Sequence, residues 1–157
     1  SHWSRNCKRW AHSIQCKNAL IVDLKSMEDL DKKKKAARTF VNMFGGSFVA
    51  LSISDTDFKI FDSKKKLISY AEVVTVNDVY DSSTDLIIKI QRLLRLSNKR
   101  LNPVIIWAFN DGIVYSKVTK LEGLIKWGSP NGKPSLPSTM ELIAYYKQNK
   151  NFKHERY

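Results

Sequence analysis

The order of apolar and polar positions along the chain predicts a mixture of helices and strands. From Met27 to Phe44, apolar residues recur at steps of three and four between lysines, which is typical of an amphipathic helix over residues 27–44. Ser26 is suited to cap its start, and Gly45 and Gly46 are suited to end it. The short apolar run at 19–24 (ALIVDL) predicts a buried strand before this helix.

From residue 47 the apolar period changes to two, which predicts antiparallel strands near 48–53, 58–60 and 67–69, with a further strand at 72–76. The polar segments 55–57 and 62–66 are expected to form turns, and 77–83 a loop. A second helix is expected over 84–97, capped by Ser83 or Thr84, and it should pack across the sheet.

The same order then repeats. Pro103 ends the second helix, because the residue before a proline avoids the α region. Strands are expected at 104–109, 113–119 and 124–128, with Asn-Asp-Gly at 110–112 and Ser-Pro-Asn-Gly at 129–132 as turns. A third helix is expected over 138–148, with core candidates Met140, Ile143, Ala144 and either Tyr145 or Tyr146.

These elements predict an α+β fold in which antiparallel β-meanders pack against about three helices. We expect one compact domain over 1–157. Its parts are an N-terminal strand and basic helix (1–45), a first meander with its helix (46–101) and a second meander with its helix (102–157).

The amino-acid composition indicates that the protein binds a negatively charged partner. The 157 residues are 43% hydrophobic, enough for a core, and carry a formal net charge of +12. That charge favours nucleic acid, anionic lipid, phosphopeptide or an acidic protein segment, although lysines also serve solubility alone. Without a long apolar run or a signal sequence, we expect an intracellular, soluble protein with no membrane span. Cys7 and Cys16 are interpreted as free thiols.

No catalytic constellation is identified. His2, His12 and His154 lie near the ends of the chain, and no phosphate loop, zinc motif or nucleophile elbow is found. Asp55, Asp57 and Asp62 with Lys64–Lys66 would fit a metal-dependent nuclease, in which acidic residues hold magnesium and a lysine polarises the phosphate. Turn formation accounts for them more simply. We therefore expect no catalytic residue, no metal, no cofactor and no enzyme activity from this domain alone.

Nucleic-acid binding is the alternative function, since basic faces with exposed aromatic rings bind single strands. The candidate stacking residues are Trp3, Trp10, Trp107, Trp127, Tyr145 and Tyr146. Trp107 lies inside an apolar strand, where alternation predicts burial, and a core role is expected for most of these rings.

Two local patterns indicate a family. The first is FNDG at 109–112, followed by strands, PNGK at 130–133 and a helix. The second combines KAARTFV at 35–41 with DFKIF at 57–61. Both resemble polo boxes, the β-sheet-plus-helix modules in the non-catalytic part of polo-like kinases. The resemblance covers about 30–150 and is nearest to the centriole-duplication class.

The resemblance implies a scaffolding or targeting role as the regulatory part of a Ser/Thr kinase, with homodimerisation and a centrosomal or centriolar location in the cytoplasm. A nucleic-acid-binding protein would instead suit the nucleus. Phosphopeptide-reading members use a His and a Lys on one strand, and this chain has no His-x-Lys. The expected ligand is therefore an acidic helix or disordered acidic segment.

The leading hypothesis is a non-catalytic protein-protein interaction module that docks this acidic segment on a basic face. The residues assigned to that face are Lys32, Lys33, Lys34, Lys35, Arg38, Lys64, Lys65, Lys66, Arg92, Arg95, Lys99 and Arg100.

Overall fold

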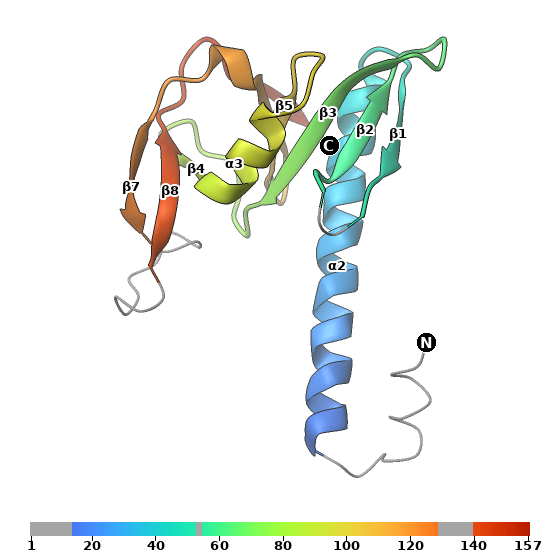
Figure 1. Ribbon diagram of the computed structural model, residues 1–157, viewed down its shortest axis with the longest axis vertical. Helices are drawn as coiled ribbons and strands as arrows, with labels where there is room; N and C mark the ends of the chain where they lie inside the picture. The colour runs from blue at the N-terminus through green and yellow to red at the C-terminus, as the bar shows by residue number, and fades with distance from the viewer. Residues whose placement is uncertain (1–13, 53–54, 129–139) are drawn as a thin grey trace. The chain divides into compact units, whose positions relative to one another are not determined.

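The computed structural model describes residues 14–52, 55–128 and 140–157, with side chains from residue 27 onward. The chain divides into two compact units, Ser1–Lys32 and Lys33–Tyr157. Helix α2 begins in the first unit and ends in the second, and all other described elements belong to the second unit (Figure 1). In order, the elements are α2 (Ile14–Asn42), β1 (Ser47–Ala50), β2 (Phe58–Phe61), β3 (Leu67–Thr75), β4 (Leu86–Lys89), α3 (Ile90–Ser97), β5 (Val104–Ala108), β6 (Gly112–Lys117), the 3-10 helix η1 (Val118–Lys120), β7 (Leu124–Gly128), β8 (Glu141–Tyr146) and β9 (Lys153–Arg156).

The strands form two sheets. The larger sheet has the order β1-β2-β3-β5-β6-β9, and the smaller one has the order β4-β8-β7. Strands β3 and β5 run parallel, because β4 and α3 carry the chain back between them, whereas the other neighbours are antiparallel. The fold class is therefore α+β, as predicted, with one mixed and one antiparallel sheet.

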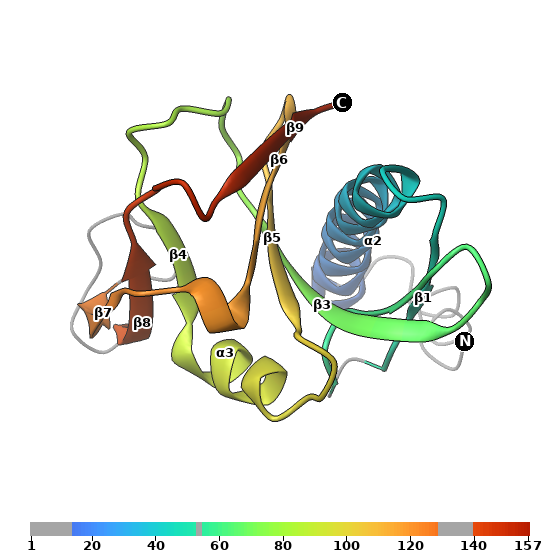
Figure 2. The same cartoon turned by 90° about the horizontal axis from the view of Figure 1, so that it is seen from above.

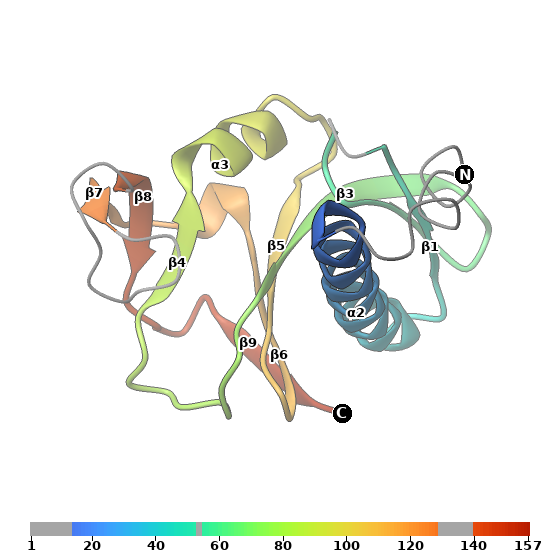
Figure 3. The same cartoon turned by 90° about the horizontal axis from the view of Figure 1, so that it is seen from below.

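Both faces of the larger sheet are covered. On one face, Ala36, Ala37 and Val41 of α2 pack against β2, β3, β5 and β6. On the other face, Leu96 of α3 and residues of the smaller sheet pack against Trp107 and its neighbours. Figures 2 and 3 show β5 between α2 on one side and α3 with β4, β7 and β8 on the other. All five residues of β5 are buried, as expected for a strand covered on both faces.

The predicted turns at Gly45 and Gly112 are confirmed. Gly45 has φ +69°, and the Gly46 amide donates to the Val41 carbonyl at 2.9 Å, so the end of α2 has the Schellman bond. Gly112 begins β6 after the Asn-Asp turn, and a Cβ there would lie 2.5 Å from the Glu155 carbonyl oxygen of β9. Glycine is required at 112 by this close approach of β9.

The strand expected at 19–24 is wrong, because α2 is continuous from Ile14 to Asn42 and the predicted cap at Ser26 lies inside it. That segment contains no glycine or proline to interrupt a helix, and a short apolar run does not by itself distinguish strand from helix. The strands expected at 67–69 and 72–76 are one strand, β3.

Two further predicted helices are corrected. The helix at 84–97 is helical only from Ile90, since Leu86–Lys89 form β4 and pair with β8. The helix at 138–148 is wrong over Glu141–Tyr146, which form β8, the central strand of the smaller sheet. Pairing with β4 and β7 decides the conformation of a segment whose apolar spacing suits either period. The described residues therefore contain two α-helices instead of three.

The aromatic residues mostly take core positions. Trp107 is fully buried and donates its indole N–H to the Ile87 carbonyl at 2.8 Å, which confirms the predicted burial. Trp127 on β7 is 63% exposed and is therefore one of the rings without a core position. His154, although close to the C-terminus, is half-buried and stacks on Tyr80. Trp3, Trp10, the turn at 129–132 and the cysteine side chains lie outside the described residues.

Candidate functional site

Two carboxylates meet where β2 begins beside the middle of β3. The β2–β3 register pairs Phe58 with Ala71, and its continuation sets Asp57 opposite Glu72. The Val73 amide donates to Asp57 Oδ2 at 2.8 Å and fixes the orientation of that carboxylate. Glu72 is 1% exposed, so it is a carboxylate in the interior of the sheet.

One cation from α3 binds both carboxylates. Arg92 Nε donates to Glu72 Oε1 at 2.9 Å, and Arg92 Nη2 donates to Asp57 Oδ2 at 3.2 Å. The same Nη2 atom donates to the Val73 carbonyl at 2.6 Å. Three oxygens, one from the residue before β2 and two from β3, therefore converge on a single guanidinium. We call Asp57, Glu72, Lys33, Arg92 and Arg95 the carboxylate cluster.

The remaining cations of the cluster approach from two helices. Lys33 Nζ of α2 lies 3.3 Å from Asp57 Oδ1, and Arg95 Nη2 of α3 lies 3.6 Å from Glu72 Oε1. Burial and the neighbouring Asp57 charge raise the pKa of Glu72, while Arg92 and Arg95 oppose that rise. Glu72 Oε2 is buried and makes no hydrogen bond with any described residue. The cluster thus contains a carboxylate oxygen whose bonding capacity is unused.

The three aspartates first considered for a metal site have separate roles. Asp62 Oδ1 accepts from the Lys64 and Lys66 amides, both at 2.9 Å, which confirms the turn interpretation for this residue. Asp55 pairs with Lys99 at 2.7 Å, and this hydrogen bond lowers the pKa of Asp55. Of these three aspartates, only Asp57 shares a cation with a second carboxylate, that of Glu72. The described residues contain no cluster of three or more His, Cys, Asp or Glu side chains suited to a metal.

The residues of the predicted basic face have different environments. Lys33, Arg92, Arg95 and Lys99 form ion pairs with carboxylates of this chain. Lys35 lies over the Tyr157 ring and Arg38 over the Phe48 ring, at 4.1 and 5.9 Å from the centroids. The side chains of Lys64, Lys65, Lys66 and Arg100 are exposed, as is that of Lys32 in the first unit, and Lys34 is half-buried.

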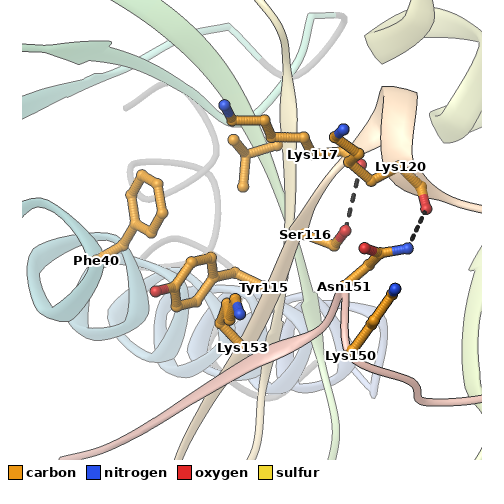
Figure 4. A pocket seen from close by; sticks show the side chains of 9 residues that line it. Phe40, Tyr115, Ser116, Lys117, Lys120, Lys150, Asn151 and Lys153 are labelled. Carbon is orange, nitrogen blue, oxygen red and sulfur yellow. Dashed lines mark hydrogen bonds between the residues drawn. The ribbon is translucent and has the colours of Figure 1, made fainter.

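A second basic region lies at the end of β6 and the start of β9. Lys117, Lys120, Lys150 and Lys153 line a pocket of about 280 Å³ whose inner wall includes Phe40 and Tyr115. Figure 4 shows Phe40 and Tyr115 on one side of the opening and Lys120, Lys150 and Asn151 on the other. We call this the lysine pocket. No residue that lines it carries a carboxylate.

Sequence reasoning missed both Glu72 and the lysine pocket. Glu72 had a local signal, because a charged residue inside the apolar run AEVV is rarely buried without a partner. The pocket lysines had no such signal, since Lys117 and Lys150 are far apart in the sequence. Only the β6–β9 pairing, with Tyr115 opposite Lys153, brings these parts of the chain together.

No protein family model, no curated protein and no solved structure matches this chain. The polo-box resemblance therefore stays a prediction. Among the described residues, no helix is long and apolar enough to cross a membrane.

Proposed function

We propose, in place of the non-catalytic role expected from the sequence, that this chain binds nucleic acid and hydrolyses its phosphodiester bonds at the carboxylate cluster, with a divalent cation as cofactor. One observation carries the proposal: Asp57 Oδ2, Glu72 Oε1 and the Val73 carbonyl all contact the guanidinium of Arg92. These three oxygens surround one position, which the positively charged guanidinium of Arg92 occupies.

The chemistry of the three oxygens fits magnesium. Mg²⁺ prefers oxygen ligands, and proteins commonly bind it with only one or two carboxylates, while waters and substrate phosphates complete its coordination. A buried carboxylate without a full set of partners, such as Glu72, gains from a nearby cation. The ion would replace Arg92 at these oxygens, which leaves the guanidinium available for a phosphate group.

A bound divalent cation would polarise a phosphoryl oxygen and lower the pKa of a coordinated water. Asp57 and Glu72 would supply the negative charge that holds it, and the Val73 amide keeps Asp57 in orientation. Lys33, 3.3 Å from Asp57, is suited to contact a phosphate oxygen beside the cation. In the hydrolysis, the water oxygen bonds to phosphorus and one P–O ester bond breaks. The leaving oxygen takes up a proton, and the attacking water releases one to solvent.

The test is cleavage of labelled single- and double-stranded DNA and RNA by the full chain in Mg²⁺ or Mn²⁺ and in EDTA. We expect metal-dependent cleavage that disappears in Asp57→Asn and Glu72→Gln, because each change removes charge from the cation site. Asp85→Asn is the matched control, since Asp85 is exposed and outside the cluster. It should cleave like the wild type.

Two results would contradict the proposal. One is an absence of cleavage of all four substrates in either metal. The other is equal cleavage by the wild type and Asp57→Asn preparations, which would show that a contaminant is responsible. Circular dichroism of each variant separates loss of the site from loss of the fold.

Docking of an acidic protein segment is a second candidate function, and it is the role that the polo-box resemblance implies. The exposure of Lys64, Lys65 and Lys66 on the turn between β2 and β3 supports it. An acidic peptide titrated against the wild type and a Lys64→Glu, Lys65→Glu, Lys66→Glu variant tests this role. Binding that is weak, or equal in the two proteins, would count against it.

A further inference from the structure

We propose that the lysine pocket is a second phosphate-binding site, separate from the carboxylate cluster, which binds the backbone of a polynucleotide strand. The choice of a polynucleotide as ligand rests on the proposed function. The site itself rests on different residues from the cluster, and its geometry supports the proposal independently.

The pocket concentrates positive charge from separate parts of the chain. Lys117 ends β6, Lys120 lies in η1, Lys150 precedes β9 and Lys153 begins it. These four lysines line one opening of about 280 Å³, and no carboxylate in the lining offsets their charge. None of the four forms a salt bridge with a described residue. An anion in the opening would therefore meet positive charge from several sides.

The rest of the lining suits one unit of a nucleic-acid strand. Phe40 and Tyr115 form an apolar inner wall, with their ring centroids 5.1 Å apart in an edge-to-face contact. The phenol of Tyr115 is neutral at pH 7 and adds no negative charge, and burial together with Glu155 raises its pKa further. The volume is just below the range of about 300–1,000 Å³ that is usual for ligand pockets, which suits a small group. Lysines on the rim would hold phosphate while the rings contact a sugar or base edge.

Lysine is the appropriate cation for this ligand. Its ammonium is a compact point charge on a flexible stem, which follows a backbone without requiring one bidentate geometry. All four side chains are exposed, so they can approach a strand that lies across the opening. The expected binding is sequence-independent and strongly dependent on salt.

The experiment measures binding of a fluorescent single-stranded oligonucleotide to the full chain in EDTA, where no cleavage occurs. The pocket variant is Lys120→Gln with Lys150→Gln, and the control is Lys64→Gln with Lys66→Gln, which removes the same charge from the exposed β2–β3 turn. We expect the pocket variant to weaken affinity about tenfold, as two lost ion pairs of ordinary strength would. The salt slope should fall by about 1.4, for two lost phosphate contacts on a single strand. The control should change affinity less than twofold.

Equal losses in the two variants would overturn the proposal, because they would reflect net charge alone. An unchanged affinity of the pocket variant would also overturn it. Inorganic phosphate should compete with the oligonucleotide for the site. If poly-glutamate competes better than unlabelled oligonucleotide, the proposal is overturned, and the ligand of the pocket is an acidic protein segment.

Failure of this proposal is distinguishable from failure of the proposed function. If the pocket is not a site, the pocket variant binds normally while Asp57→Asn still abolishes cleavage. If the cluster is not catalytic, no cleavage occurs while the pocket variant still loses affinity in EDTA.

Discussion

The carboxylate cluster and the lysine pocket are both rich in cations, but they use that charge in opposite ways. In the cluster, Lys33 pairs with the half-buried Asp57, and Arg92 pairs with both Asp57 and the buried Glu72. In the pocket, exposed lysines surround an opening lined by no acidic residue. Cations in the first region hold strands and helices together, whereas those in the second have charge available for a ligand. The number of lysines in a segment therefore does not reveal how much of its charge can act on a partner.

The largest effect is expected when Arg92, the cation that binds both carboxylates of the cluster, is removed. In EDTA we expect Arg92→Met to lose about 3 kcal/mol of unfolding free energy, because Asp57 and the buried Glu72 are left without their shared cation. Mg²⁺ or Mn²⁺ should restore much of that loss and raise the melting temperature of the variant more than that of the wild type. Urea unfolding and thermal scans with and without metal measure both effects.

Arg100→Met is the control for that substitution, since Arg100 is exposed and outside the cluster. A destabilised Arg92→Met that no divalent cation rescues would leave the cluster as a structural ion-pair network. It would remove the main support for the proposed metal site.

The ionisation of Glu72 should make the unfolding free energy depend on pH. Burial and the Asp57 charge raise its pKa in the folded state, so protonation of Glu72 favours folding. This contribution is fully present below the ordinary glutamate pKa, about 4.3, and is lost as pH rises through the folded-state pKa. The stability of the wild type relative to Glu72→Gln should therefore fall as pH increases, by about 1.4 kcal/mol for each unit of the shift.

Urea titrations from pH 4 to pH 8 measure this trend. Glu122→Gln serves as control, because Glu122 is exposed and its replacement should give a difference that does not vary with pH. A flat difference for Glu72→Gln would show that Arg92 and Arg95 fully offset its burial.

The smallest effect is expected in the lysine pocket. Lys120→Gln with Lys150→Gln should change the unfolding free energy by less than about 0.5 kcal/mol, in the stabilising direction if relief of repulsion prevails. Urea unfolding at low salt checks it. A loss above about 1 kcal/mol would mean that these lysines, like Arg92, are used within the fold.

Several elements were predictable because their signals are local. The end of α2 at Gly45, strand β2 and the turn before Gly112 depend on residues within a few positions of each other. The segments 86–89 and 141–146 were not predictable in this way. Each has an apolar spacing that suits either a helix or a strand, and the hydrogen bonds between β4 and β8 decide the outcome.

The candidate sites, like the strands β4 and β8, depend on residues that are distant in the sequence. The amino-acid sequence was sufficient to predict an α+β chain with a large positive charge, a basic helix and turns at Gly45 and Gly112. Which charges are used internally follows from the folded arrangement, because the β2–β3 pairing sets Asp57 opposite Glu72 and α3 brings Arg92 to both. The folded arrangement also places Lys117 and Lys153 at one pocket, through the pairing of β6 with β9. Charge is a property of each residue, whereas its availability depends on neighbours that are distant in the sequence.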